Sequence, residues 1–134
     1  MIALDTNAVL RLLLGDIPAQ QKEVEVLIAR LAAKNDTAFI GVPVLLEVTF
    51  VLKKKRTKEE IINAIDGLLT IDVFTVDHSA EVREALEMWR RKPAGFNDLL
   101  IGTLGRAAGC AKGATFDQNL QKSDPFFVAP NAIL

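Results

Sequence analysis

The chain has 134 residues, half of them apolar and a quarter charged, which is enough to bury one core and excludes a disordered or fibrous protein. Its formal net charge of −1 excludes a strong overall attraction to polyanions, so any contact with nucleic acid has to come from a local group of Lys and Arg. The only cysteine, Cys110, cannot form an intrachain disulfide and fits a reducing, cytoplasmic setting. No apolar run approaches the roughly 20 residues that span a bilayer, so we expect no membrane segment.

The first half of the chain alternates between strand-like and helix-like spacing of apolar residues. In chain order, we expect a short buried strand at residues 1–4, a helix at 7–15, a helix that begins at Pro18 and is broken by "NDT", a strand at 38–42, and helices at 43–55 and 58–70. Asp5 and Thr6 can cap the first of these helices, and Gly15 can end it.

The second half continues this alternation. We expect a strand at residues 72–76, a helix from Ser79 to about Arg91, a helix at 97–109, a strand at 112–116 and a short fifth strand at 126–130. The glycines at 102 and 105 suggest a close approach of the last helix to the sheet, and Gly109 suits its end. Strands separated by helices predict an α/β sandwich with a mainly parallel central sheet of about four to five strands, in a single domain over residues 1–134.

Two aspartates stand directly after predicted strands. Asp5 and Asp117 are each followed two positions later by an asparagine. An aspartate that caps a helix or a turn explains either residue alone, but its recurrence with the same asparagine offset weakens that explanation. In an open parallel sheet, ligands bind beyond the carboxyl ends of the strands, where both aspartates are expected.

Two further acids lie on predicted helices. Glu47 stands among apolar residues, so it either has a partner for its charge or lies on a narrow exposed stripe, and both interpretations stay open. Asp98 is near the start of a helix, where an acid is favourable for the helix by itself. If all four acids meet at one end of the sheet, their repulsion requires a divalent ion, for which Mg²⁺ or Mn²⁺ is the natural candidate.

Four motifs in this order resemble the PIN-domain nucleases, and among them the VapC toxins of bacterial and archaeal toxin–antitoxin pairs. They are "LDTNAVLRLLLGD", "VLLEVTFVL", "FNDLLIG" and "ATFDQNL". The resemblance covers nearly the whole chain and implies a PIN-like α/β/α sandwich. It also implies a Mg²⁺- or Mn²⁺-dependent ribonuclease that is held inactive by a cognate antitoxin and forms a homodimer.

The resemblance also implies a set of site residues. The acidic quartet that holds the metal and performs catalysis would be Asp5, Glu47, Asp98 and Asp117. Their polar neighbours would be Thr6, Asn7 and Thr115.

Two basic runs end predicted helices. The residues considered for RNA binding are Lys53, Lys54, Lys55, Arg56, Arg90 and Arg91. Basic side chains at a helix C-terminus are also explained by the helix dipole on a solvated face, so phosphate binding and this structural role both stay open.

Several other residues are not expected to take part in chemistry. We expect Trp89 to pack in the core, His78 to lie in a region between a strand and a helix, and the remaining acids to be surface or turn residues; these acids include Asp16, Asp66, Asp72 and Asp124.

Two other functions remain to be weighed against a nuclease. A non-catalytic interaction module could keep the PIN fold without the chemistry. An aspartyl phosphotransfer domain also places an aspartate after its first strand, but a dehalogenase-type phosphatase needs a second acid where this chain has Asn7.

Overall fold

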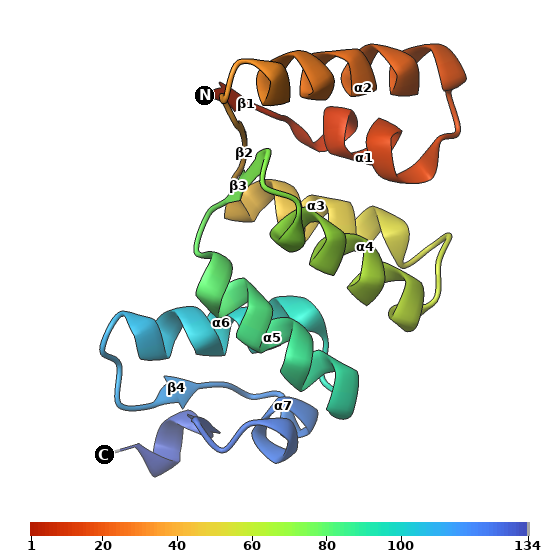
Figure 1. Ribbon diagram of the computed structural model, residues 1–134. Coiled ribbons are helices and arrows are strands. Elements are labelled where there is room, and N and C mark those ends of the chain that lie inside the picture. Colours follow the sequence, from red (N-terminus) through yellow and green to blue (C-terminus); the bar gives the residue numbers. More distant parts are fainter. Residues whose placement is uncertain (134) are drawn as a thin grey trace. The chain divides into compact units, whose positions relative to one another are not determined.

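The computed structural model describes residues 1–133, which divide into a first unit, Met1–Ser79, and a second unit that begins at Ala80. The helices, labelled where there is room in Figure 1, are α1 (Thr6–Leu14), α2 (Pro18–Ala33), α3 (Val42–Leu52), α4 (Lys58–Thr70), α5 (Ser79–Arg91), α6 (Phe96–Ala107) and α7 (Gln118–Ser123), followed by the 3-10 helix η1 (Pro130–Ala132). The strands are β1 (Ile2–Ala3), β2 (Ala38–Ile40), β3 (Phe74–Val76), β4 (Gly113–Ala114) and β5 (Phe127–Val128).

The first unit is built on a three-stranded parallel sheet in the order β1-β2-β3. Ile2 pairs with Ala38, and Ala38 in turn pairs with Phe74, so β2 is the central strand. Ala38 and Ile40 are fully buried, and α1 packs against both α2 and α3. The carboxyl ends of β1 and β2 lead directly into α1 and α3, which carry the first two acidic motifs.

The helices of the first unit begin and end at residues with clear local signals. Gly15 ends α1 in the left-handed region, with φ of 62°, where a glycine avoids the steric cost of a Cβ atom. Thr57 begins α4 with a capping box: its side chain accepts the N–H of Glu60, and the Glu60 carboxylate accepts the N–H of Thr57. The hydrogen bond that the backbone N–H of Thr57 donates to the Glu60 carboxylate holds the pKa of Glu60 below its usual value.

The second unit contains a two-stranded parallel sheet, β4-β5, in which Gly113 pairs with Phe127. A Cβ atom at Gly113 would lie 2.6 Å from a ring carbon of Phe127, and one at Gly102 of α6 would lie 2.8 Å from another carbon of the same ring. These distances leave no room for a side chain at either position. The close approach of α6 predicted from its glycines is therefore confirmed at Gly102.

The predicted α/β class with parallel strands is confirmed by five strands whose pairings are all parallel. Every predicted helix and strand is present, although the strands are shorter than expected. The prediction that the first strand is buried is wrong for Ile2 and Ala3, because β1 pairs only with β2 among the described residues and Ile2 stays 44% exposed. The helix α7 was not predicted, since six residues are too few for a helical period to show.

No helix within residues 1–133 is long and apolar enough to cross a membrane.

Candidate active site

The first unit brings together the first two acidic motifs. Asp5 is the N-cap of α1, and its Oδ1 accepts the N–H of Ala8 at 2.9 Å. The next residue, Thr6, donates its hydroxyl to Oε2 of Glu47 on α3 at 3.0 Å. This hydrogen bond joins residues 41 positions apart in the sequence and places the Glu47 carboxylate beside the start of α1.

The side chain of Glu47 is exposed, which decides between the two interpretations of its apolar surroundings. It lies on a solvent-facing stripe of α3, whereas Leu45, Val48 and Thr49 on the same helix are buried. The buried hydroxyl of Thr49 donates to the carbonyl of Leu45 at 2.7 Å. Glu47 therefore carries no burial penalty, and its carboxylate is accessible to a ligand.

In the second unit, Asp117 caps a helix in the same way as Asp5 does in the first unit. Oδ1 of Asp117, the N-cap of α7, accepts the N–H of Leu120 at 3.1 Å. The backbone N–H of Asp117 donates to the hydroxyl of Thr115 at 3.1 Å, and the N–H of Thr115 donates to the carbonyl of Val128 at 3.0 Å. Thr115 therefore fixes the backbone that presents the Asp117 carboxylate.

Asp98 lies in the first turn of α6, whose N-cap, Gly95, offers no side chain to cap the helix. Asp98 is half-buried, and Phe96 and Leu99 of the same helix are fully buried. An acid in this position is stabilised by the helix dipole. Beside it, Oδ1 of Asn97 is buried without a hydrogen-bond partner among the described residues, an arrangement that normally costs free energy.

Each unit thus contributes two of the four predicted acids: Asp5 and Glu47 in the first, Asp98 and Asp117 in the second. Within residues 1–133, neither unit by itself contains a group of three His, Cys, Asp or Glu side chains that could hold a metal ion. The chemistry of the donors nevertheless suits a hard divalent cation, because each carboxylate offers about four lone-pair sites and Asp5, Glu47 and Asp117 each use one oxygen in the bonds above.

Asn7, a predicted neighbour of the site, is exposed and lines a cleft of about 870 Å³ between α1 and α2. Arg11, Lys22 and Arg30 also line this cleft. Nε of Arg11 is buried without a hydrogen-bond partner among the described residues, while its Nη1 donates to Asp16 at 3.2 Å. No local pattern in the sequence marks this cleft, because its walls come from two separate helices.

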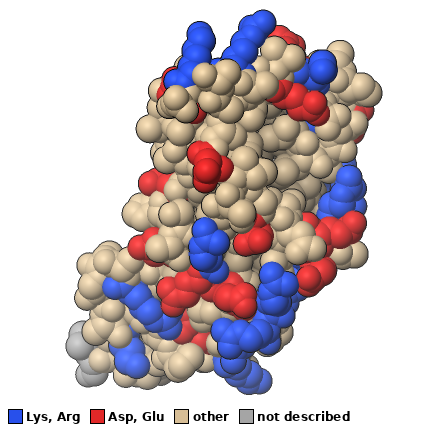
Figure 2. Space-filling model, viewed as in Figure 1, with Lys and Arg blue, Asp and Glu red and all other residues tan. Residues whose placement is uncertain are grey.

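The six basic residues considered for RNA binding are all exposed. The run Lys53–Arg56 forms the turn after α3, and Nζ of Lys54 lies 4.7 Å from the centre of the Phe50 ring. At the end of α5, Nε of Arg90 lies 3.6 Å from the Glu87 carboxylate. On the face drawn in Figure 2, Lys and Arg are interspersed with Asp and Glu.

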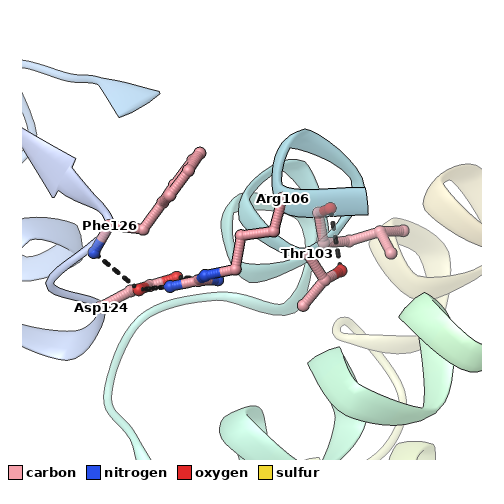
Figure 3. Close-up of polar contacts among 5 residues, drawn as sticks. Thr103, Arg106, Asp124 and Phe126 are labelled. Carbon is pink, nitrogen blue, oxygen red and sulfur yellow. Dashed lines mark hydrogen bonds and ion pairs between the residues drawn. The ribbon is translucent and has the colours of Figure 1, made fainter. Parts of the chain in front are cut away.

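An ion pair between a partly exposed guanidinium and a buried carboxylate in the second unit was not predicted. Asp124, at the end of α7, is completely buried, and its carboxylate accepts two hydrogen bonds from the guanidinium of Arg106 on α6 (Figure 3). Asp124 also accepts the N–H of Phe126 at 3.0 Å, and the Arg106 guanidinium lies over the Phe126 ring. Asp124 was expected to be a surface or turn residue, and it lies in a turn, since the N–H of Phe127 donates to its carbonyl at 3.0 Å. Its carboxylate is nevertheless buried, and Arg106 compensates the charge.

The remaining expectations are met where the structure describes them. Trp89 is buried and its ring lies 5.7 Å from that of Phe96, as expected for a packing residue. His78 lies between β3 and α5 in the left-handed region, with φ of 51°. Asp16, Asp66 and Asp72 are exposed.

Comparison with known proteins gives one family and one curated relative. The family model for the PIN domain matches residues 2–124, which is nearly the whole chain. A VapC ribonuclease from Aquifex aeolicus (strain VF5) is 23% identical over 124 residues, which cover 91% of each of the two chains. No solved structure matches the chain.

Proposed function

Since the chain belongs to the PIN domain family, we propose that it is a metal-dependent ribonuclease that hydrolyses RNA phosphodiester bonds and acts as the toxin of a toxin–antitoxin pair. The similarity to a VapC ribonuclease supports the substrate and this biological role. The structural observation that carries the proposal is the hydrogen bond from Thr6 to Glu47, because it joins two distant acidic motifs at the carboxyl end of a parallel sheet.

The proposed catalytic and metal-binding set is Asp5, Glu47, Asp98 and Asp117. Thr6 orients Glu47, Thr115 fixes the backbone of Asp117, and Asn7 is a further polar neighbour. Carboxylate oxygens are the ligands that Mg²⁺ and Mn²⁺ prefer. Four carboxylates without a countercharge repel one another, so they can lie close together only if such an ion neutralises them. The proposed set takes two acids from each unit.

The chemistry needs no side-chain nucleophile. A divalent ion held by these acids would polarise the phosphoryl oxygens and would make water a better nucleophile near neutral pH. The exposed carboxylates of Asp5, Glu47 and Asp117 can hold that ion in position, since hydrogen bonds from Thr6, Ala8 and Leu120 fix their geometry. A carboxylate of this set can also accept the proton that the attacking water loses.

Removal of metal should abolish the activity. We expect mixed cellular RNA to be cut by the protein in Mg²⁺ or Mn²⁺, to stay intact in EDTA, and to be cut again when excess metal is restored. Gel electrophoresis of the RNA, followed by mapping of the cut ends, measures this. RNA that stays intact in every metal-containing reaction would contradict the proposal and favour a non-catalytic interaction module.

The basic run Lys53–Arg56 is proposed to contact RNA phosphates, because its four side chains are exposed and follow the helix that carries Glu47. Replacing all four by Gln should weaken binding of a single-stranded RNA in EDTA. It should also reduce the slope of log K against log salt by about 0.7 for each phosphate that is no longer neutralised. A variant in which the three lysines become Arg and Arg56 becomes Lys keeps the charge and should retain the wild-type slope. An unchanged slope in the Gln variant would leave these residues with only a structural role.

The proposed protein partners are a cognate antitoxin and a second copy of the chain. An apolar groove of about 340 Å³, lined in part by Leu13, Ile28, Leu68 and Ile71, runs over helices of the first unit and can accept an apolar segment of an antitoxin. A basic side chain of that segment placed among the carboxylates would displace the metal and block cleavage. The RNA substrate and the free thiol of Cys110 both suit a cytoplasmic location.

A further inference from the structure

Phe116 is an aromatic residue in an unusual position. It is 88% exposed, more than any other large apolar side chain among the described residues. It directly precedes Asp117, one of the proposed catalytic acids. An exposed phenylalanine ring contributes almost nothing to the core of its own chain, so packing does not explain why an aromatic residue stands there.

The backbone that presents this ring is fixed on both sides. Before it, the N–H of Thr115 donates to Val128, and the carbonyl of Thr115 accepts the side-chain amide of Gln121 at 3.0 Å. After it, the N–H of Asp117 donates to the Thr115 hydroxyl, and the Asp117 side chain caps α7. The hydrogen-bonded backbone on both sides therefore keeps the Phe116 ring exposed to solvent.

We propose that Phe116 is a stacking platform for a base of single-stranded RNA, next to the phosphate that is cleaved. This inference rests on the proposed ribonuclease function and adds a substrate class to it. The Cα atoms of Phe116 and Asp117 are neighbours along the chain and so lie about 3.8 Å apart. A phosphate held near the Asp117 carboxylate brings the base of an adjoining nucleotide within reach of the ring.

Stacking on an aromatic side chain requires a base whose face is uncovered. In a duplex, neighbouring bases cover both faces, whereas loops and single strands can splay a base onto such a ring. The ring has no charge, so it adds affinity without neutralising a phosphate. Its contribution should therefore be independent of salt, unlike that of the basic run Lys53–Arg56.

The test is binding of a short single-stranded RNA to the full-length chain in EDTA, measured by fluorescence anisotropy. Phe116→Ala should weaken binding roughly 5- to 150-fold, the effect of losing one stacked base, with an unchanged salt slope. Phe116→Trp should restore binding. The control Ile17→Ala, which shortens a side chain that is 40% exposed in the other unit, should bind like the wild type.

A set of RNAs, each with a single abasic nucleotide at a different position, locates the contact. At one position, the loss of the base should weaken wild-type binding and leave Phe116→Ala unaffected. Equal binding by the wild type and Phe116→Ala would overturn the stacking role, as would a loss of binding that follows a change in oligomeric state. If the wild type still cleaves RNA in Mg²⁺ in either case, the ribonuclease proposal stands. If the wild type neither binds nor cleaves RNA, both proposals fail.

Discussion

Asp5→Asn and Asp117→Asn should each lower kcat/KM for RNA cleavage by about 10²–10³-fold or more, with little change in stability. An amide keeps the shape of the carboxylate but loses the charge that would hold a divalent ion. Positioned metal contributes several kcal/mol to charge stabilisation in the transition state, which corresponds to this loss of rate. Asparagine is also a favoured N-cap residue, so the bonds from Ala8 and Leu120 should persist.

The control for these two variants is Asp72→Asn, which removes the same charge from an exposed acid outside the proposed site. Initial rates of cleavage at matched Mg²⁺ and thermal unfolding midpoints should be measured for all three proteins. Rates near that of Asp72→Asn for either site variant would remove that aspartate from the catalytic set. A large fall in the unfolding midpoint would instead show that the substitution disturbs the fold, so the lost rate could not be assigned to the lost charge.

Arg106→Met should destabilise the protein by about 3–5 kcal/mol, because it leaves the completely buried carboxylate of Asp124 without its countercharge. Asp124→Asn should cost less, about 1–3 kcal/mol. In that variant the guanidinium of Arg106, whose side chain is 36% exposed, can be solvated, and the amide oxygen can still accept the N–H of Phe126.

Urea unfolding followed by tryptophan fluorescence measures these changes, since Trp89 is the only tryptophan and is buried in the second unit. The double variant should be less destabilised than the sum of the two single variants, because they disrupt one interaction. Equal and small effects of the single variants, or simple additivity in the double variant, would show that the pair contributes little to stability.

The features that the sequence predicted well are those set by neighbouring residues. Asp5 as a cap, Gly15 as a helix end and Pro18 at a helix start all act within one turn of the chain, so a short pattern contains the necessary information. The same holds for the position of Asp98 at the start of a helix.

The features that could not be predicted depend on residues far apart in the sequence. Arg106 and Asp124 are 18 positions apart, and nothing local marks either of them as a partner of the other. The exposure of Glu47 depends on which face of α3 packs inward, which a helix rich in apolar residues does not reveal. For the candidate site, the sequence predicts four acids, and both their role and their assembly around an ion stay predictions, because assembly is a three-dimensional property.

The capping role of Asp5 and Asp117 has a consequence for recognising inactive copies of this protein. Each of these residues accepts the N–H three positions later in its helix, a role that Asn, Ser and Thr also perform well. Of these four residue types, only Asp brings a negative charge. A gene copy that drifts from Asp to Asn at either position would therefore encode a protein with the same helices and an unchanged backbone. Under the metal-binding role proposed for these two aspartates, that protein would be inactive, and only the identity of one side chain, not a comparison of folds, would reveal the loss.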